Sequence, residues 1–372
     1  MQILQQPASL TFENNIADFK IQKATGETSL MFRLFLGSTL ILEEEYLYDA
    51  DGFVYIRDLA SLVSFYFTEQ VTPDSGYQIV TGSVKEFAYT INENEDNGYF
   101  IVIRSSAEIN GLTATQFVRS RFLTRLQSKR TLPTSNEFLS FLMMDTDTAF
   151  VINYRVFCSV GGVISDLTGV LLTINETTQA YRVAMFDASY KAVKAVAEDG
   201  QPFTIDHIYE YRIWAESTAS GVLFSSFSFF PDYSIYSRQK LFVFKNCFNM
   251  PEVFVSTGKC STNSRLDAGF SISGLRMRKV TQELELLHTC NTGYLSDEEL
   301  AWLDDFITSY SVSKLEGAAL ADVVITETDK SLSTANELQA FSFTYRLARA
   351  NHQSVSGILD GLFDHTFDTT YN

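Results

Sequence analysis

Residues 241–255 read LFVFKNCFNMPEVFV and constrain the fold more than any other stretch of the chain. Two runs rich in β-branched and aromatic residues flank a polar corner made of Lys245, Asn246 and Cys247. Such residues favour strands, and Pro251 lacks the N–H group that a central strand would donate. The stretch therefore predicts a strand, a corner and a second strand that together open a C-terminal module.

The composition extends this β prediction to the whole chain. Phe occurs 31 times and Tyr 18 times, whereas Pro occurs only 6 times, and aromatic residues favour half-buried pleated surfaces. A length of 372 residues exceeds one ordinary core. We therefore predict a mainly β fold of several β-sandwich-like modules, with one clear amphipathic helix in the C-terminal module.

Turn signals and alternating runs divide the chain into three predicted modules. Residues 1–145 form an N-terminal β-rich module, residues 146–235 a central β-sandwich-like module, and residues 236–372 a C-terminal β module. Short apolar strands punctuated by Gly, Asn and Asp are typical of such modules. Residues 191–197 fit either a strand or a short helix, and the polar tail after Asn351 is expected to be loosely ordered or docked on a neighbour.

The helix is expected over residues 296–309. Ser296 and Glu299 form a capping box, and acidic residues fill the first turn, where the helix dipole favours them. Leu300, Leu303 and Ile307 recur at helical spacing and predict one buried stripe.

Neighbouring side chains on this helix are assigned to opposite environments. Trp302 lies beside the apolar stripe and is expected in the core. The acid pair Asp304 and Asp305 is expected on the solvent side. Trp214, which ends the strand-like run from His207, is expected to be a buried strand residue.

Charge and cysteine usage exclude some classes of function. The net charge of −17 disfavours nucleic-acid binding, which needs a surplus of basic residues. No apolar run is long enough for a membrane span, and the N-terminus lacks the pattern of a signal peptide. The four cysteines, Cys158, Cys247, Cys260 and Cys290, form no C-x-x-C pair. They are expected to be buried free thiols in a reducing compartment.

The sequence contains no recognisable catalytic or metal-binding motif. The four histidines lack metal-ligand spacing, and no P-loop or G-x-S-x-G element occurs. Asp49, Asp51 and Gly52 resemble the start of a calcium loop, but its closing glutamate is replaced by Asp58. We therefore expect no catalytic residues, no cofactor and no metal. A carboxylate pair for glycoside cleavage needs no sequence proximity and stays open.

Two groups of residues are candidates for an interface. The first is a basic cluster around residues 116–130, which suits an anionic ligand, a subunit contact or simply a solvated face. The second is the polar corner, where an intersubunit or interdomain contact is expected. The candidate residues are Arg119, Arg121, Arg125, Lys245, Asn246 and Phe248.

Several segments resemble structural proteins of tailed phages and prophages of Bacteroidales-type bacteria. The segments are residues 48–63, 122–124, 245–259, 294–309, 324–327 and 341–346. The resemblance implies a non-enzymatic virion protein of the tail or baseplate region, assembled in the bacterial cytoplasm. Such proteins commonly form rings, so the implied partners are further copies of this chain and other tail proteins. No active site is carried over from that group.

An alternative hypothesis is a receptor- or carbohydrate-binding β-sandwich protein. Tyr and Trp side chains on such modules bind sugars by stacking. A monomeric protein that binds glycans would favour this alternative, whereas a closed oligomer would favour the ring component.

Overall fold

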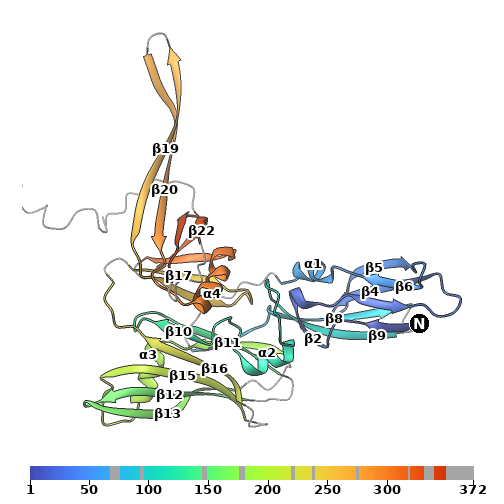
Figure 1. Ribbon diagram of the computed structural model, residues 1–372, viewed down its shortest axis with the longest axis horizontal. Coiled ribbons are helices and arrows are strands. Elements are labelled where there is room, and N and C mark those ends of the chain that lie inside the picture. The colour runs from blue at the N-terminus through green and yellow to red at the C-terminus, as the bar shows by residue number, and fades with distance from the viewer. Residues whose placement is uncertain are drawn as a thin grey trace, which may run out of the picture.

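The computed structural model describes residues 1–67, 76–92, 96–144, 149–175, 181–218, 223–236, 239–273, 276–316, 319–330 and 339–348. Strands account for 55% and helices for 12%, so the predicted mainly β, multi-domain class is confirmed. Figure 1 shows an N-terminal lobe on the right, a central lobe below and a C-terminal lobe above, from which a long arm projects.

The N-terminal lobe is built from two sheets that face each other. One has the strand order β2-β9-β8-β4-β5 and the other β1-β3-β6. Between them lies a core that includes the buried rings of Phe19, Phe32, Phe87 and Phe100. Its elements are β1 (Gln2–Gln5), β2 (Leu10–Phe12), β3 (Phe19–Gln22), β4 (Ser29–Leu36), β5 (Thr39–Leu47), β6 (Phe53–Ile56), α1 (Leu59–Ser64), β8 (Val84–Ile91) and β9 (Asp96–Ile103).

The central lobe also contains two sheets. Their strand orders are β10-β16-β15-β12-β13 and β11-β14-β7. Its elements are β7 (Tyr77–Val80), α2 (Ala114–Ser120), β10 (Ser128–Thr131), β11 (Phe138–Met143), β12 (Phe150–Val160), β13 (Val163–Ile174), β14 (Arg182–Asp187), α3 (Tyr190–Glu198), β15 (His207–Ser217) and β16 (Leu223–Pro231). The stretch whose type the sequence left open is therefore the helix α3, which begins after Ser189, whose side chain accepts from the N–H of Ala192.

The C-terminal lobe is a seven-stranded sheet with one helix on its face. The strand order is β18-β17-β21-β22-β23-β20-β19. Phe306 of α4 packs edge-on against Phe242 and Phe244 of β17. The elements are β17 (Lys240–Lys245), β18 (Pro251–Ser256), β19 (Cys260–Ser273), β20 (Arg276–Asn291), α4 (Asp297–Thr308), β21 (Val312–Glu316), β22 (Ala319–Asp329) and β23 (Ser342–Leu347).

The helix α4 follows its sequence signals closely. Ser296 and Glu299 form the capping box, and Leu300, Leu303 and Trp302 are buried. Asp305, however, is only 4% exposed, so the expectation that both acids of the pair face solvent is wrong for this residue. Its carboxylate has hydrogen-bonding and ionic partners in the interior, described below, which make its burial tolerable.

The sheets exchange strands across the predicted boundary at residue 145. β7 and β11, which precede it, pair with β14, which follows it. β10 likewise pairs in parallel with β16. One buried cluster then continues from the central lobe into the C-terminal sheet. The three predicted modules therefore share cores, and the division at residues 145 and 235 stays a prediction.

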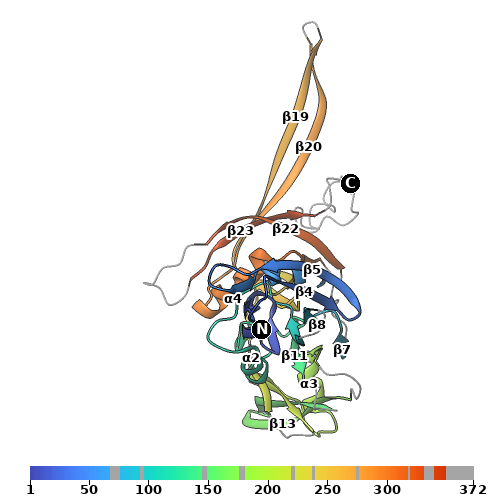
Figure 2. The same ribbon diagram turned by 90° about the vertical axis from the view of Figure 1, so that its right-hand side faces the viewer.

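The hairpin of β19 and β20 forms the projecting arm. β20 pairs with β23 only at its end, from His288 to Asn291. Beyond that base the two strands pair with each other alone, and both views show them leading away from the rest of the protein (Figures 1 and 2). Within the described residues the outer arm is thus a two-stranded ribbon.

The base of the arm carries a disulfide that the sequence reasoning did not predict. Cys260 and Cys290 are direct cross-strand partners, with Cα atoms 4.1 Å apart, and are joined by a disulfide. The expectation of four free thiols is therefore wrong for this pair, because the hairpin register brings two distant cysteines together. Cys158 and Cys247 are free and buried, as expected.

Candidate functional site

The corner predicted between the two strands is a tightly hydrogen-bonded turn between β17 and β18. Asn246 is buried, and its Oδ1 accepts from the N–H groups of Phe248 (2.9 Å) and Met250 (3.0 Å). Asn249 adopts a left-handed conformation with φ of 62°, which asparagine tolerates better than most residues. One asparagine side chain therefore holds the whole corner in shape.

The corner also contacts segments far away in the sequence. Asn246 Nδ2 donates to the carbonyl of Leu123 at 2.8 Å, and the N–H of Ser106 donates to the carbonyl of Cys247 at 2.7 Å. The ring of Phe248 lies 5.6 Å from that of Phe12. The corner is thus a junction between the C-terminal sheet and the segments around β2 and α2.

The helix α4 supplies the third side of this junction. Asp305 Oδ2 accepts from the N–H of Cys247 at 3.0 Å, and Oδ1 pairs with Arg125 Nε at 3.1 Å. Trp302 Nε1 donates to the carboxylate of Glu252, which also accepts from Asn246 Nδ2. The carboxylates of Asp305 and Glu252 therefore connect the helix to the corner.

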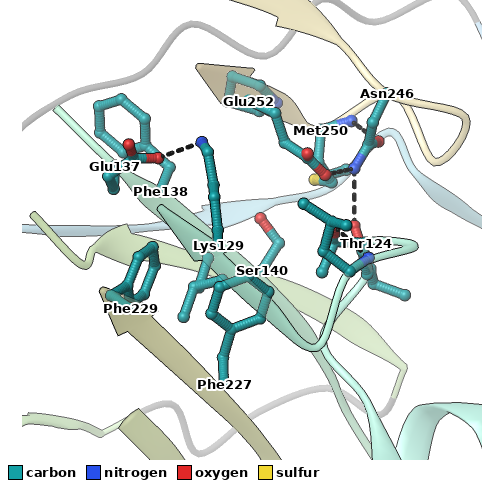
Figure 3. Close-up of a pocket in the computed structure, with 14 residues that line it drawn as sticks. Thr124, Lys129, Glu137, Phe138, Ser140, Phe227, Phe229, Asn246, Met250 and Glu252 are labelled. Carbon is teal, nitrogen blue, oxygen red and sulfur yellow. Dashed lines mark hydrogen bonds and ion pairs between the residues drawn. The ribbon is translucent and has the colours of Figure 1, made fainter. Parts of the chain in front are cut away.

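A buried ion pair lies next to this network, as Figure 3 shows. Lys129 Nζ lies 2.6 Å from Glu137 Oε2 and also donates to the carbonyl of Val253. Glu137 Oε1 accepts from the hydroxyl groups of Thr131 and Ser135. Both members of the pair are buried, and their hydrogen-bonding capacity is largely satisfied.

The structure brings together four of the six candidate interface residues. Lys245, Asn246 and Phe248 form the corner, and Arg125 reaches it through Asp305. Arg119 is exposed in the last turn of α2, and Arg121 is half-buried just beyond it. The intersubunit role predicted for these residues stays a prediction.

Sequence reasoning did not predict the buried contacts of Glu252, Asp305, Lys129 and Glu137. A charged residue within an otherwise apolar strand was the available signal for Glu252, which interrupts the run from Pro251 to Val255. Such a residue is either at an edge or satisfied by buried partners. Apart from Asn246, the partner of Glu252 is Trp302, which lies 50 residues further along the chain, so pattern alone could not identify it.

Burial controls the ionisation of Glu252. Removal from water raises the pKa of its carboxyl to about 7, although hydrogen bonds from Asn246 and Trp302 and the charge of Lys129 oppose the shift. Burial likewise raises the pKa of Asp305, against the contacts from Cys247 and Arg125. The junction therefore contains a carboxyl group that changes charge near neutral pH.

We expect this group to make stability depend on pH. Folded Glu252 holds its proton up to about pH 7, whereas an ordinary glutamate releases it near 4.5. The folded state thus binds more protons within this window, and the free energy of unfolding falls as the pH rises through it, by about 3 kcal/mol. Urea denaturation of Glu252→Gln at pH 5, 6, 7 and 8 should show a smaller slope than that of the parent protein. Glu86→Gln, at an exposed strand position, should leave the slope unchanged; equal slopes in all three proteins would contradict the assignment.

The described residues contain no candidate metal centre. No group of three His, Cys, Asp or Glu side chains suited to a metal ion occurs among them. The Asp49 carboxylate accepts from the N–H groups of Asp51 and Phe53 and so closes a turn. No helix in the described part of the chain is long and apolar enough to span a membrane.

Comparisons with known proteins add no assignment. Neither the scan against protein-family models nor the search of curated proteins finds a match to this chain. The phage origin therefore rests on the sequence resemblance and stays a prediction.

Proposed function

We propose that this chain is a non-enzymatic structural subunit that assembles with copies of itself into a ring, as a tail or baseplate component of a tailed phage. The proposal of self-assembly is based on the projecting arm. The phage assignment rests on the sequence resemblance alone, and the two parts of the proposal are tested separately.

The arm has one apolar face that the described part of the chain leaves uncovered. Leu266, Phe270, Met277 and Leu286 are 42–65% exposed. In the register, Met277 pairs with Ile272 and Leu266 with Leu284. Because directly paired residues share a face and alternate residues of a strand do too, all four exposed side chains lie on one side of the ribbon.

A ribbon of this kind favours a partner. Two-stranded hairpins are marginally stable in water on their own and gain stability by packing an apolar face against another surface. The outer strand β19 is also at the edge of its sheet and offers unpaired backbone groups. An arm that docks on a neighbour would satisfy both requirements.

Charge favours a second copy as that neighbour. Residues 269–282 contain three basic residues and no acidic one, in a chain of net charge −17. Glu43, Glu44 and Glu45 form an exposed acidic stretch on β5. An arm that reaches from one subunit to a different surface of the next is a heterologous contact, which closes into a ring when the rotation permits.

Light scattering coupled to size-exclusion chromatography tests the assembly. The parent protein should give a mass several times 41.9 kDa, with rings visible by negative-stain electron microscopy. The double variant Phe270→Asp/Met277→Asp should weaken association by roughly 100-fold or more, since two apolar contacts are lost. Ile164→Asp, a change at a position 77% exposed on β13, is the matched control and should assemble normally.

Three results would overturn parts of the proposal. A strict monomer at high concentration would contradict self-assembly. A double variant that assembles as well as its parent would show that the arm does not mediate it. If mass spectrometry of purified phage particles detects other tail proteins but not this chain, the virion assignment is contradicted. That result would not contradict self-assembly.

A further inference from the structure

A cavity of about 270 Å³ lies beside the polar corner. Arg104 and Ser106, which follow β9, line one part of it, and Lys245, Asp305 and Ser309 line another. The cavity therefore borders segments of the N-terminal half and the C-terminal lobe at the place where they meet.

Lys245 is the lining residue that the fold leaves unsatisfied. Its Nζ atom is buried and has no hydrogen-bond partner within the described structure. Burial lowers the pKa of its amine to about 8, so the group is still mostly protonated at neutral pH. A buried ammonium without a partner is costly, and proteins normally supply a counter-charge.

The positive excess at the cavity lies at Lys245, because Arg104 already faces the buried carboxyl of Glu13, whose pKa burial raises and the charge of Arg104 lowers. Arg104 Nη1 donates to the carbonyl of Phe67, and a guanidinium carries five N–H donors in all. Asp305 is the acidic residue among the lining side chains, and both its oxygens are engaged, by Arg125 Nε at 3.1 Å and by the N–H of Cys247 at 3.0 Å. The charge of Asp305 is therefore already balanced by Arg125.

We infer that this cavity binds a small oxyanion, either phosphate or a carboxylate, with Lys245 and Arg104 as its charged partners. The anion would supply the counter-charge that Lys245 lacks. Because the two cations come from the two sides of the junction, a bound anion would also hold the N-terminal segment against the C-terminal sheet. The site is independent of whether the protein forms a ring.

Thermal unfolding and isothermal titration calorimetry test the inference on the chain of 372 residues. Inorganic phosphate and sodium acetate are compared with sodium chloride at matched ionic strength. The melting temperature of the parent protein should rise with one or both oxyanions and not with chloride, and the comparison shows which of the two binds. Lys245→Met should lose at least tenfold in oxyanion affinity and should unfold no earlier than the parent in chloride alone, since it removes an unpaired buried charge.

Two further variants separate binding from folding. Lys191→Met alters an exposed lysine on α3 and should keep the full response to the oxyanion. Arg104→Leu, which alters the other cation, should also weaken the response if it folds. No oxyanion-dependent stabilisation in the parent protein, or an equal response in Lys245→Met, would overturn the inference.

Discussion

Lys129→Met should lower the free energy of unfolding by about 3–5 kcal/mol, because it leaves the buried carboxylate of Glu137 without its counter-charge. Lys129 is within 2.6 Å of Glu137, and neither side chain is more than 10% exposed. The substitution also removes a contact with the carbonyl of Val253 and one with the ring of Trp302. Urea denaturation followed by circular dichroism would measure the loss.

Two companion variants identify the cause of this effect. Lys129→Met/Glu137→Met should recover at least half of the loss, since a buried pair can often be replaced by apolar side chains at little net cost. Arg155→Met breaks an exposed pair with Asp166, whose side chains are 44% and 39% exposed, and should destabilise the protein far less than Lys129→Met. A double variant as unstable as the single one would show that packing, and not the orphaned charge, dominates.

The parts of the fold that local chemistry controls could be predicted from the sequence. The capping box of Ser296 and Glu299 placed the start of α4, because a capping box involves only residues within one turn. The polar corner between two apolar runs similarly predicted the turn that joins β17 to β18. In each case the deciding interactions lie within a few residues of each other.

The pairing of distant strands could not be predicted in this way. β7 and β11 pair with β14 through a register that no local pattern encodes. The Cys260–Cys290 disulfide depends on a hairpin register that shifts by one residue between Gly269 and Phe270. A bulge of this kind is a property of the whole ladder, so counting residues outward from the turn would have missed the pairing.

Only part of the candidate site could be predicted, because its remaining contacts also join segments that are distant in the sequence. Lys245, Asn246 and Phe248 were singled out because the corner interrupts two apolar runs. Asp305 was placed on the wrong side, because its helix position borders the apolar stripe and its burial depends on Arg125 and Cys247. An acid at such a position is buried only when the tertiary fold supplies partners.

Asn246→Ala should be as damaging as the loss of Lys129, at about 3–5 kcal/mol of unfolding free energy, because one buried side chain serves four partners. The N–H groups of Phe248 and Met250 would lose their acceptor, and the carbonyl of Leu123 and the carboxylate of Glu252 would lose a donor. Asn97→Ala, at an exposed position on β9, is the matched control and should be nearly neutral.

Asn246→Asp separates the two roles of this side chain. It keeps the acceptor for Phe248 and Met250 but sets a carboxylate against Glu252. The destabilisation should therefore grow as the pH rises through about 7, where Glu252 loses its proton. Urea denaturation between pH 5 and pH 8 measures this growth. If Asn246→Asp lowers the free energy of unfolding equally at every pH, the shape of this side chain, and not its charge, determines the stability of the corner. If Asn246→Ala lowers it negligibly, the corner does not stabilise the junction between the lobes.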